Sequence, residues 1–399
     1  MKKLMILGAS VLQIPAIIEA KKMGIYVIVV DMNPNAEGFS YADKKIVVST
    51  TDTQRVLEVA KENDIDGIIT IASDRPMRTV AKVAEELNLI GIDEKTAVNA
   101  TNKSKMRDAL KKYSVPIPMY FSVDDYEQYL EAIKKIRNKN YKCIVKPADN
   151  SGSRGIRLIE NYEEKELEKV YKYCKENSNS GSLVVEEFMQ GPEVSVETIS
   201  YKGVCHVIQV TDKITTGSPY FVEMGHNQPS SLDLKTIEKI KKVAIDANKA
   251  IGIKDGPSHT EIKVTKDGPK IVELGARLGG DNITTHLVPY STGVNMVEAC
   301  INIALGKEID IRKKFDKASV ARYKKCDIGK IIKIEGIEDA KKIHGIKNVK
   351  IVHGVGEESR EIKNSNDRVA YVIAQDDNVL KAITSCDKAL ELIKIEVEK

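Results

Sequence analysis

Short hydrophobic runs separated by amphipathic stretches fill the first 100 residues. The apolar runs predict buried strands, and the stretches with a helical period predict helices between them. The expected strands are residues 3–8, 26–31, 44–49 and 66–73, and the clearest helices are residues 15–24 and 53–64. Strands that alternate with helices are typical of a doubly wound parallel sheet. We therefore expect an α/β domain at residues 1–100.

Beyond residue 100 the pattern becomes that of an antiparallel sheet. Residues 193–200 and 204–212 alternate apolar and polar positions, as strands with one solvated face do. An amphipathic helix at 234–252 precedes a hairpin within 259–275, whose strands are joined by a Lys-Asp-Gly turn. Residues 321–399 have a strand and helix rhythm of their own. We expect this last segment to form a small α+β domain.

Charge and cysteine content exclude several classes of protein. The net charge is +4, from 62 basic and 58 acidic residues, and the lysines are scattered through helical stretches. A nucleic-acid-binding protein concentrates its basic charge on one face, so we expect no nucleic-acid partner. The six cysteines are far apart and form no CxxC pair. This spacing argues against a zinc ribbon or a disulfide scaffold and favours a reducing compartment.

The N-terminus superficially resembles a signal peptide, because two lysines precede apolar residues. Gly8, Pro15 and Glu19 interrupt the run, so a strand, turn and helix fit better. No apolar run approaches the roughly 20 residues that cross a bilayer. We expect a soluble, cytoplasmic protein that acts on small-molecule substrates and does not bind a membrane. A homodimer is one arrangement that the sequence leaves open.

Two loops resemble nucleotide-binding motifs only in part. The loop after the first strand, Gly8-Ala9-Ser10, lacks the later glycines of the dinucleotide fingerprint, which argues against a dehydrogenase. A second Gly/Ser loop lies in CIVKPADNSGSRG, directly after Lys146. In a P-loop the glycines precede the lysine, so the reversed order here excludes that motif. A lysine beside a flexible loop still suggests phosphate binding.

Ionisable residues occur at strand positions where packing alone favours apolar side chains. They are Lys146, Glu186, Glu187, Glu261 and Glu273. Glu261 and Glu273 lie on neighbouring strands, where their carboxylates can converge on a hard cation such as Mg²⁺. Each residue also has a structural alternative. Lys146 is then an edge-strand lysine, Glu261 pairs with Lys263 on a solvated face, and the Glu186–Glu187 pair simply ends a strand.

The order of these segments along the chain resembles the ATP-grasp superfamily. NKSKMRDAL, VKPADNSGSRG, VVEEFMQGPE and VELGAR are similar to its two lysine segments, its hinge and its metal segment. VEMGHNQPS and the tail GKIIKIEG…KNVKIVHG…DRVAYVIAQ are similar to the L-amino-acid ligases (bacilysin-type dipeptide synthases). Carbamoyl-phosphate synthase and biotin carboxylase resemble the chain more distantly. The resemblance implies a pre-ATP-grasp domain at 1–100, an ATP-grasp domain at 101–320 with a lid at about 121–190, and a C-terminal α+β domain at 321–399.

The resemblance also implies where ATP binds. Lys103 and Lys146 would contact the phosphates, and the lid loop would fold over them. Residues 186–189 would flank the adenine, and Glu193 would bind the ribose hydroxyls. The implied nucleotide-binding residues are Lys103, Lys146, Ser151, Gly152, Ser153, Glu186, Glu187, Phe188, Met189 and Glu193.

The same resemblance assigns metal and catalytic roles. Glu261 and Glu273 would bind Mg²⁺, with Mn²⁺ as an alternative, and Arg277 would face the reacting phosphoryl group. Most relatives have an Asn ligand where this chain has Gly275, although the amino-acid ligases also carry a small residue there. Glu223 and His226 would contact an amino-acid substrate. A loop histidine without a ligand is the alternative for His226.

These roles imply an ADP-forming carbon–nitrogen ligase. A carboxylate would receive the γ-phosphoryl group of ATP, and an amine would displace phosphate from the acyl phosphate to form an amide or peptide bond. The alternatives are a carboxylating or carbamoylating enzyme and a nucleotide-binding regulatory protein without turnover. We expect the segments Gly8–Ser10, Ser73–Arg75 and Gly280–Asn282 to select the two substrates. Asp281 either holds an ammonium group or caps the next helix. The sequence does not identify the acid or the amine.

Overall fold

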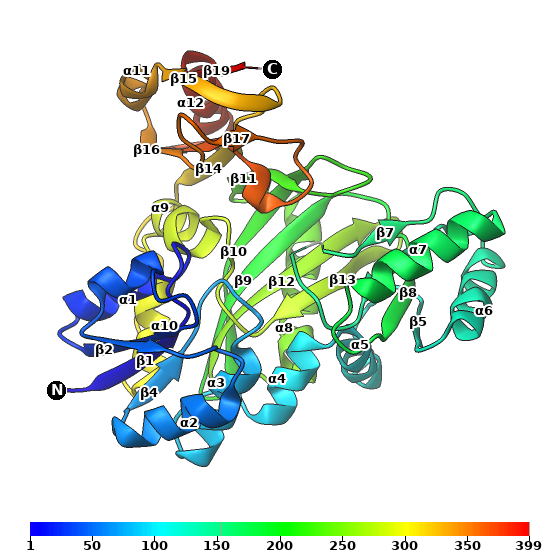
Figure 1. Cartoon of the computed structure of the whole chain (residues 1–399), viewed down its shortest axis with the longest axis horizontal. Coiled ribbons are helices and arrows are strands. Elements are labelled where there is room, and N and C mark those ends of the chain that lie inside the picture. Colours follow the sequence, from blue (N-terminus) through cyan, green and yellow to red (C-terminus); the bar gives the residue numbers. More distant parts are fainter. Residues whose placement is uncertain (153, 399) are drawn as a thin grey trace.

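The structure is a computed structural model that describes residues 1–152 and 154–398. Its N-terminal unit is a parallel sheet of four strands in the order β3-β2-β1-β4 (Figure 1). The elements of this unit are β1 (Lys3–Leu7), α1 (Ile14–Lys22), β2 (Tyr26–Asp31), the 3₁₀ turn η1 (Glu37–Tyr41), β3 (Lys44–Val47), α2 (Thr53–Glu62), β4 (Gly67–Ile69), α3 (Met77–Glu86) and α4 (Glu94–Thr101).

Alternate residues of β1 point to opposite faces of this sheet, and both faces are covered. Leu4 and Ile6 pack with α1 and with the distant helix α10 (Met296–Ala304), whereas Met5 and Leu7 pack with α2 and α3. The predicted doubly wound sheet is therefore confirmed. The strand predicted at 66–73 is too long, because β4 ends at Ile69 and the backbone soon turns at Ala72, where φ is 57°.

The lid is an antiparallel sheet with the order β5-β8-β6-β7. Its elements are β5 (Tyr120–Val123), α6 (Tyr126–Arg137), β6 (Cys143–Pro147), β7 (Arg157–Leu158), α7 (Glu164–Glu176) and β8 (Leu183–Glu187). Val145 and Val185 pack against α6 and α7, so Lys146 and Glu186 point to the opposite face. Lys146 is not a solvated edge-strand lysine, because it is buried and its ammonium group contacts Glu186.

An antiparallel sheet of eight strands forms the core, in the order β13-β12-β9-β10-β11-β14-β18-β16. Helix α8 covers one face through the apolar cluster that contains Val194, Val196, Ile262 and Ile271. The core elements are α5 (Lys103–Lys112), β9 (Glu193–Tyr201), β10 (Val204–Thr215), β11 (Glu223–Gln228), α8 (Leu234–Ile251), β12 (Gly256–Thr265), β13 (Gly268–Gly275), the π-helical turn η2 (Ile283–Leu287) and α9 (Val288–Thr292).

The C-terminal segment extends the core sheet instead of standing apart from it. Strand β14 pairs with β11, and β18 and β16 continue the sheet. A second sheet of three strands has the order β17-β15-β19. The elements are β14 (Ala318–Tyr323), β15 (Gly329–Glu335), α11 (Ile337–Lys342), β16 (Ile346–Ile351), β17 (Glu358–Ser359), η3 (Ser365–Asp367), β18 (Ala370–Asp376), α12 (Val379–Leu392) and β19 (Lys394–Glu398).

The N-terminal unit and the lid lie on opposite sides of the core, with the C-terminal segment at one end (Figure 1). This arrangement encloses one face of the core sheet. The exact domain boundaries remain predictions. No helix within residues 1–152 and 154–398 is both long and apolar enough to cross a membrane.

Candidate active site

A cavity of about 580 Å³ lies where all parts of the chain meet. Its lining includes Asp74 from the N-terminal unit, Lys146 from the lid, Glu261 from the core and Asn364 from the C-terminal segment. A site that needs every part of the fold could not be located by any single sequence motif.

Most of the predicted site residues line this cavity. They are Lys146, Ser151, Gly152, Glu186, Glu187, Phe188, Met189, Glu193, Glu223, His226, Glu261, Glu273 and Arg277. Lys103 is not part of the lining, but its ammonium group contacts Glu273, which is. Ser153 lies outside the residues that the structure describes. The motifs that the sequence singled out therefore gather at one place.

Glu261 and Glu273 are direct partners across β12 and β13. A regular hairpin would place Val272 opposite Glu261, because Ile262 pairs with Ile271. A bulge after Ile271 adds one residue to β13 and so brings Glu273 into register with Glu261. The two carboxylates share one cavity wall because of this local irregularity.

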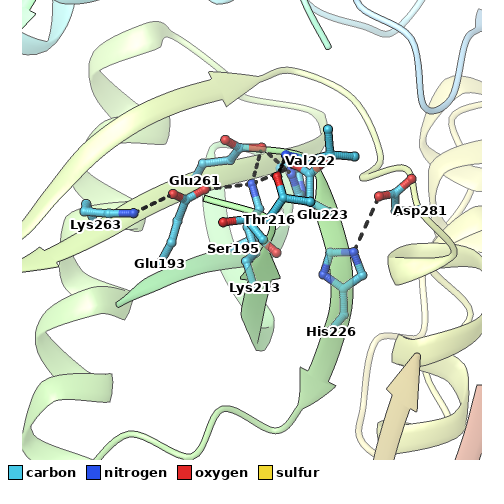
Figure 2. A network of polar contacts seen from close by, with 12 residues as sticks. Glu193, Ser195, Lys213, Thr216, Val222, Glu223, His226, Glu261, Lys263 and Asp281 are labelled. Carbon is cyan, nitrogen blue, oxygen red and sulfur yellow. Dashed lines mark hydrogen bonds and ion pairs between the residues drawn. The ribbon is translucent and has the colours of Figure 1, made fainter. Parts of the chain in front are cut away.

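A buried lysine, Lys213 on β10, lies at the centre of the acidic cluster (Figure 2). Its Nζ is 2.9 Å from Glu193, 2.9 Å from Glu261 and 3.2 Å from Glu223. Burial acts to lower the pKa of Lys213, but the three carboxylates outweigh it and raise the pKa well above its usual value. Lys213 therefore stays charged and holds three carboxylates together that would otherwise repel one another.

The pair Glu261 and Glu273 fits a hard divalent cation in part. Among the described residues, no group of three or more Asp, Glu, His or Cys side chains is arranged to hold a metal. Magnesium commonly binds one or two carboxylates and takes its other ligands from water and substrate phosphates. The two facing carboxylates match that pattern, so a bound nucleotide would have to complete the site.

Lys146 belongs to a buried charge cluster on the lid. Its Nζ is 2.8 Å from Glu186 Oε2, and Arg107 Nε on α5 donates to the other carboxylate oxygen at 2.5 Å. Burial acts to raise the pKa of Glu186, but Arg107 and Lys146 outweigh it and lower the pKa to about 2. The carboxylate stays ionised and fixes the lysine at the cavity wall.

The predicted hinge residues have partners of their own. Glu187 accepts hydrogen bonds from Lys270 Nζ at 2.8 Å and from the Met119 amide at 3.1 Å. Phe188 lies beside Phe221, with ring centroids 5.9 Å apart. These residues give the cavity an apolar wall next to a carboxylate that the protein already neutralises.

Glu193 also has protein partners. Lys213 and Lys263 contact separate oxygens of its carboxylate, each at 2.9 Å (Figure 2). Lys263 thus pairs with Glu193, and the alternative pairing of Lys263 with Glu261 on a solvated face is not seen.

Arg277 forms a bidentate ion pair with Asp74 of the N-terminal unit. Nε donates to Oδ1 at 2.8 Å and Nη2 donates to Oδ2 at 2.9 Å. A Cβ on Gly275 would lie 2.8 Å from Asp74 Oδ1, closer than ordinary contact allows. Asp74 therefore occupies the space that a side chain at position 275 would take.

Glu223 and His226 face the cavity from one end of β11, near Asp281 (Figure 2). Asp281 accepts two hydrogen bonds from Arg368, and Oδ2 lies 3.5 Å from His226 Nε2. Burial acts to raise the pKa of Asp281, but Arg368 and His226 hold the pKa well below its usual value. The prediction that Asp281 caps a helix is wrong, because η2 has no side-chain cap and Arg368 binds the carboxylate instead. Its binding of an ammonium group stays a prediction.

A second histidine, His259, completes the acidic wall. Its Nδ1 is 2.7 Å from Glu197 Oε1, and its Nε2 is 3.4 Å from Glu261. Burial acts to lower the pKa of His259, but Glu197 and Glu261 raise it to about 9. Glu261 is therefore flanked by two cationic side chains, Lys213 and His259.

Three family models match successive parts of the chain. One for the ATP-grasp N-terminal domain matches residues 17–90, one for the ATP-grasp domain matches 139–285, and one for the L-amino acid ligase C-terminal domain 2 matches 326–398. The chain belongs to the ATP-grasp superfamily. The predicted ATP-grasp fold is confirmed, including its N-terminal domain.

Individual ATP-grasp proteins resemble the whole chain or much of it. Alanine–anticapsin ligase of Bacillus subtilis strain 168 is 29% identical over 280 residues, which are 65% of this chain and 58% of that protein. Phosphoribosylamine–glycine ligase of Methanocaldococcus jannaschii is 27% identical over 327 residues, which are 76% of this chain and 72% of that protein. Both names are those of ligases, which supports the predicted carbon–nitrogen ligase.

A solved structure of the L-amino acid ligase from Bacillus licheniformis superimposes with a TM-score of 0.84. The alignment covers 100% of this chain and 99% of that one, at 23% sequence identity. At this level of identity the likeness shows the ATP-grasp fold alone.

Sequence reasoning missed several residues of this ATP-grasp site. Lys213 is an ionisable residue late in an alternating strand, the same signal that identified Lys146 and Glu261. Arg107 lies one helical turn after Lys103, which places both on one face of α5. Glu197 carries the same signal, since it lies within the strand predicted at 193–200, whereas Arg368 gave no local signal.

Proposed function

We propose that the protein is an ATP-dependent carboxylate–amine ligase that forms an amide or peptide bond through an acyl phosphate, with an amino acid on at least one side. The observation that carries the proposal is the composition of one cavity. Its lining contains the cation Lys146 on the lid and the facing carboxylates of Glu261 and Glu273. It also contains Arg277 and the pair Glu223 and His226.

The lid side of the cavity suits a nucleotide. Ile144, Phe188 and Met189 supply apolar surface for a base, and Lys146 supplies a cation for phosphate oxygens. Gly152 lies in the loop after Lys146 with φ at 68°, and a Cβ on it would meet no atom within 4 Å. The loop therefore has room to approach a triphosphate with its backbone N–H groups.

Glu261 and Glu273 would hold Mg²⁺ together with the phosphate oxygens. The bound ion would offset negative charge on the transferring phosphoryl group. Lys103 contacts Glu273 at 2.9 Å, and Lys213 contacts Glu261 at the same distance. The two lysines fix the orientation of these carboxylates before a nucleotide binds.

The proposed reaction begins with attack of a substrate carboxylate oxygen on the γ-phosphorus of ATP. The new carboxyl O–P bond forms while the bond to the β-phosphate oxygen breaks, so ADP leaves and an acyl phosphate remains. An uncharged amine then attacks the carbonyl carbon, loses a proton, and expels phosphate. Arg277 would contact the transferring phosphoryl group and the oxyanion of the second step. Closure of the lid would exclude water, which otherwise hydrolyses the acyl phosphate.

The other end of the cavity suits an amino acid. Glu223 is a carboxylate with one neighbour at 3.2 Å, Lys213, and it would bind an α-ammonium group. His226 is fully buried, and neither ring nitrogen has a hydrogen-bond partner among the residues that the structure describes. A buried imidazole without partners is costly unless a ligand satisfies it. It would bind the carboxylate of the substrate or its phosphorylated form.

The proposal is tested by incubating the protein with ATP, Mg²⁺ and pooled amino acids and small acids. We expect ADP and phosphate to appear together with a new amide mass. If the acid carries ¹⁸O in its carboxylate, one labelled oxygen should appear in the released phosphate, because the acyl phosphate bond is broken at carbon. Nucleotide binding without ADP release in any pool would instead favour a regulatory protein. ADP release with unlabelled phosphate would exclude the acyl phosphate.

A further inference from the structure

The C-terminal segment reaches into the cavity through residues 364–366. These residues precede β18 and line the cavity beside Glu223 and Asp281. Residues 365–367 form the 3₁₀ turn η3, which Asn364 caps by accepting a hydrogen bond from the Asn366 amide. Separate family models match the ATP-grasp core, at residues 139–285, and the segment that contains this turn, at residues 326–398.

Arg368 follows this turn and attaches it to the core. Its Nη1 and Nη2 donate to the two carboxylate oxygens of Asp281 at 2.8 and 2.7 Å. Nη1 also donates to the Glu223 carbonyl at 2.9 Å, and Nε donates to the Ser365 carbonyl at 2.8 Å. The guanidinium lies over the ring of Tyr323, 3.8 Å from its centroid. One side chain thus ties the cavity wall to two core elements.

Arg368 has little capacity left to bind a substrate. All three of its nitrogens donate to protein oxygens, one face is covered by Tyr323, and only 6% of the residue is exposed. A planar bidentate pair also fixes the orientation of the carboxylate that it binds. The pair therefore fixes the orientation of Asp281, whose Oδ2 also lies 3.5 Å from His226 Nε2.

His226 depends on this arrangement for its orientation. Both of its ring nitrogens are buried, and no other side chain among those described forms a hydrogen bond with either of them. The ring of Tyr323 stands edge-on to the imidazole, with centroids 6.4 Å apart. Among the described residues, Asp281 is the acidic side chain that forms an ion-pair contact with the ring. If Asp281 rotates, His226 loses the contact that directs it into the cavity.

We propose that Arg368 is a positioning residue of the C-terminal segment that orients His226 through Asp281 and thereby completes the amino-acid end of the cavity. This inference rests on the proposed function for the identity of the substrate, but the geometry of the three side chains does not. The C-terminal segment is then part of the active site, and its attachment determines how a substrate is bound there.

The orientation of His226 can be measured in the full-length protein without a substrate. Protein labelled with ¹⁵N-histidine gives ring-nitrogen signals, and the His226 signals are those missing from His226→Gln. We expect these signals to move in Arg368→Lys and Asp281→Asn, because the bidentate contact is lost in both. Arg312→Lys is the matched control, since Arg312 also forms a bidentate pair with an aspartate, Asp310, but does not line the cavity.

The result that overturns the inference is a set of His226 signals at their wild-type positions in both Arg368→Lys and Asp281→Asn. A shift of the same size in Arg312→Lys would also overturn it, because the effect would then not depend on the pair of Arg368 and Asp281. Arg368→Lys keeps the charge and most of the length of the side chain, so it serves where Arg368→Ala fails to fold.

A kinetic measurement tests the consequence for binding. The concentration of pooled L-amino acids that half-saturates ADP release should rise by about tenfold in Arg368→Lys, as small misplacements in active sites produce. The calorimetric affinity for MgADP should not change, since the hydrogen-bond partners of Arg368 among the described residues lie outside the lid. Equal loss of both affinities would contradict a role at the amino-acid end. If the wild type releases no ADP with any pool, the proposed function fails while the histidine signals still test the positioning.

Discussion

Arg277 and Asp74 are 203 residues apart in the sequence and form a bidentate ion pair in the wall of the cavity. Their side chains are only 16% and 15% exposed. The pair joins the ATP-grasp core to the N-terminal domain at the residue that we expect to face the reacting phosphoryl group. Domain attachment and the proposed catalytic role therefore share one guanidinium group.

We predict that Arg277→Ala lowers the turnover number by about a hundredfold or more, because a charge that stabilises the transition state is lost. ATP affinity, measured by calorimetry, should change little. The variant also leaves Asp74 buried without a partner, so Asp74→Ala/Arg277→Ala is the control for that structural cost. The double variant should recover thermal stability but not turnover. Wild-type turnover in the double variant would contradict a catalytic role.

Gly275 lies where the family resemblance predicts an Asn metal ligand, so introducing that Asn tests the metal site. Gly275→Asn should lower turnover instead of creating a better metal site, because its Cβ would lie 2.8 Å from Asp74 Oδ1 and 3.3 Å from Arg277 Cζ. The measurement is the rate of ADP release as a function of Mg²⁺ concentration. Gly91→Asn is the control, since Gly91 is exposed, lies outside the cavity lining, and its Cβ would be 3.4 Å from Ala84 Cβ, which is ordinary contact. A lower Mg²⁺ requirement with unchanged turnover would show that Asp74 does not exclude the ligand.

Lys146→Ala should weaken ATP binding by about tenfold, because one charge-assisted contact with phosphate is removed. Calorimetry with a non-hydrolysable ATP analogue measures the change directly. Lys142→Ala is a suitable control, because Lys142 is exposed and lies just before the same strand. Unchanged affinity in Lys146→Ala would mean that its ammonium group serves Glu186 alone.

Much of the fold could be predicted from hydrophobic periodicity, because the parallel N-terminal sheet and the antiparallel core differ in pattern. Part of the site could also be predicted from the pattern, since Lys146, Glu261 and Glu273 are charged residues at strand positions. The bulge that places Glu273 opposite Glu261 depends on one extra residue in β13, and no local pattern marks it. The pairing of β14 with β11 was not foreseen either, because it joins strands from separate sequence regions.

The interaction partners of the predicted residues were the hardest feature to predict from the sequence. Arg277 was assigned from its motif, but its contact with Asp74 depends on how two domains pack. Glu193 was assigned to ribose, yet Lys213 and Lys263 already bind its carboxylate. Long-range ion pairs of this kind depend on tertiary packing, and a motif with one-dimensional spacing does not contain that information.

Glu186 gives a prediction about stability and pH. Its pKa is about 2 in the folded protein, below its ordinary value of 4.5, because Arg107 and Lys146 outweigh the effect of burial. The ionised carboxylate therefore stabilises the fold at pH values above 4.5, and this contribution is lost as the pH falls from 4.5 towards 2. The shift corresponds to roughly 3 kcal/mol of unfolding free energy.

Glu186→Gln should thus be less stable than the wild type at pH 7, since it leaves two buried cations without a carboxylate. The difference between the two proteins should narrow as the pH approaches 3, because only the wild type loses the charge. Urea unfolding followed by circular dichroism at several pH values measures this difference. Glu238→Gln is the control, because its pair with Lys241 is exposed and should contribute little at any pH. A difference in unfolding free energy that stays constant with pH would mean that the pKa of Glu186 is the same in the folded and unfolded states.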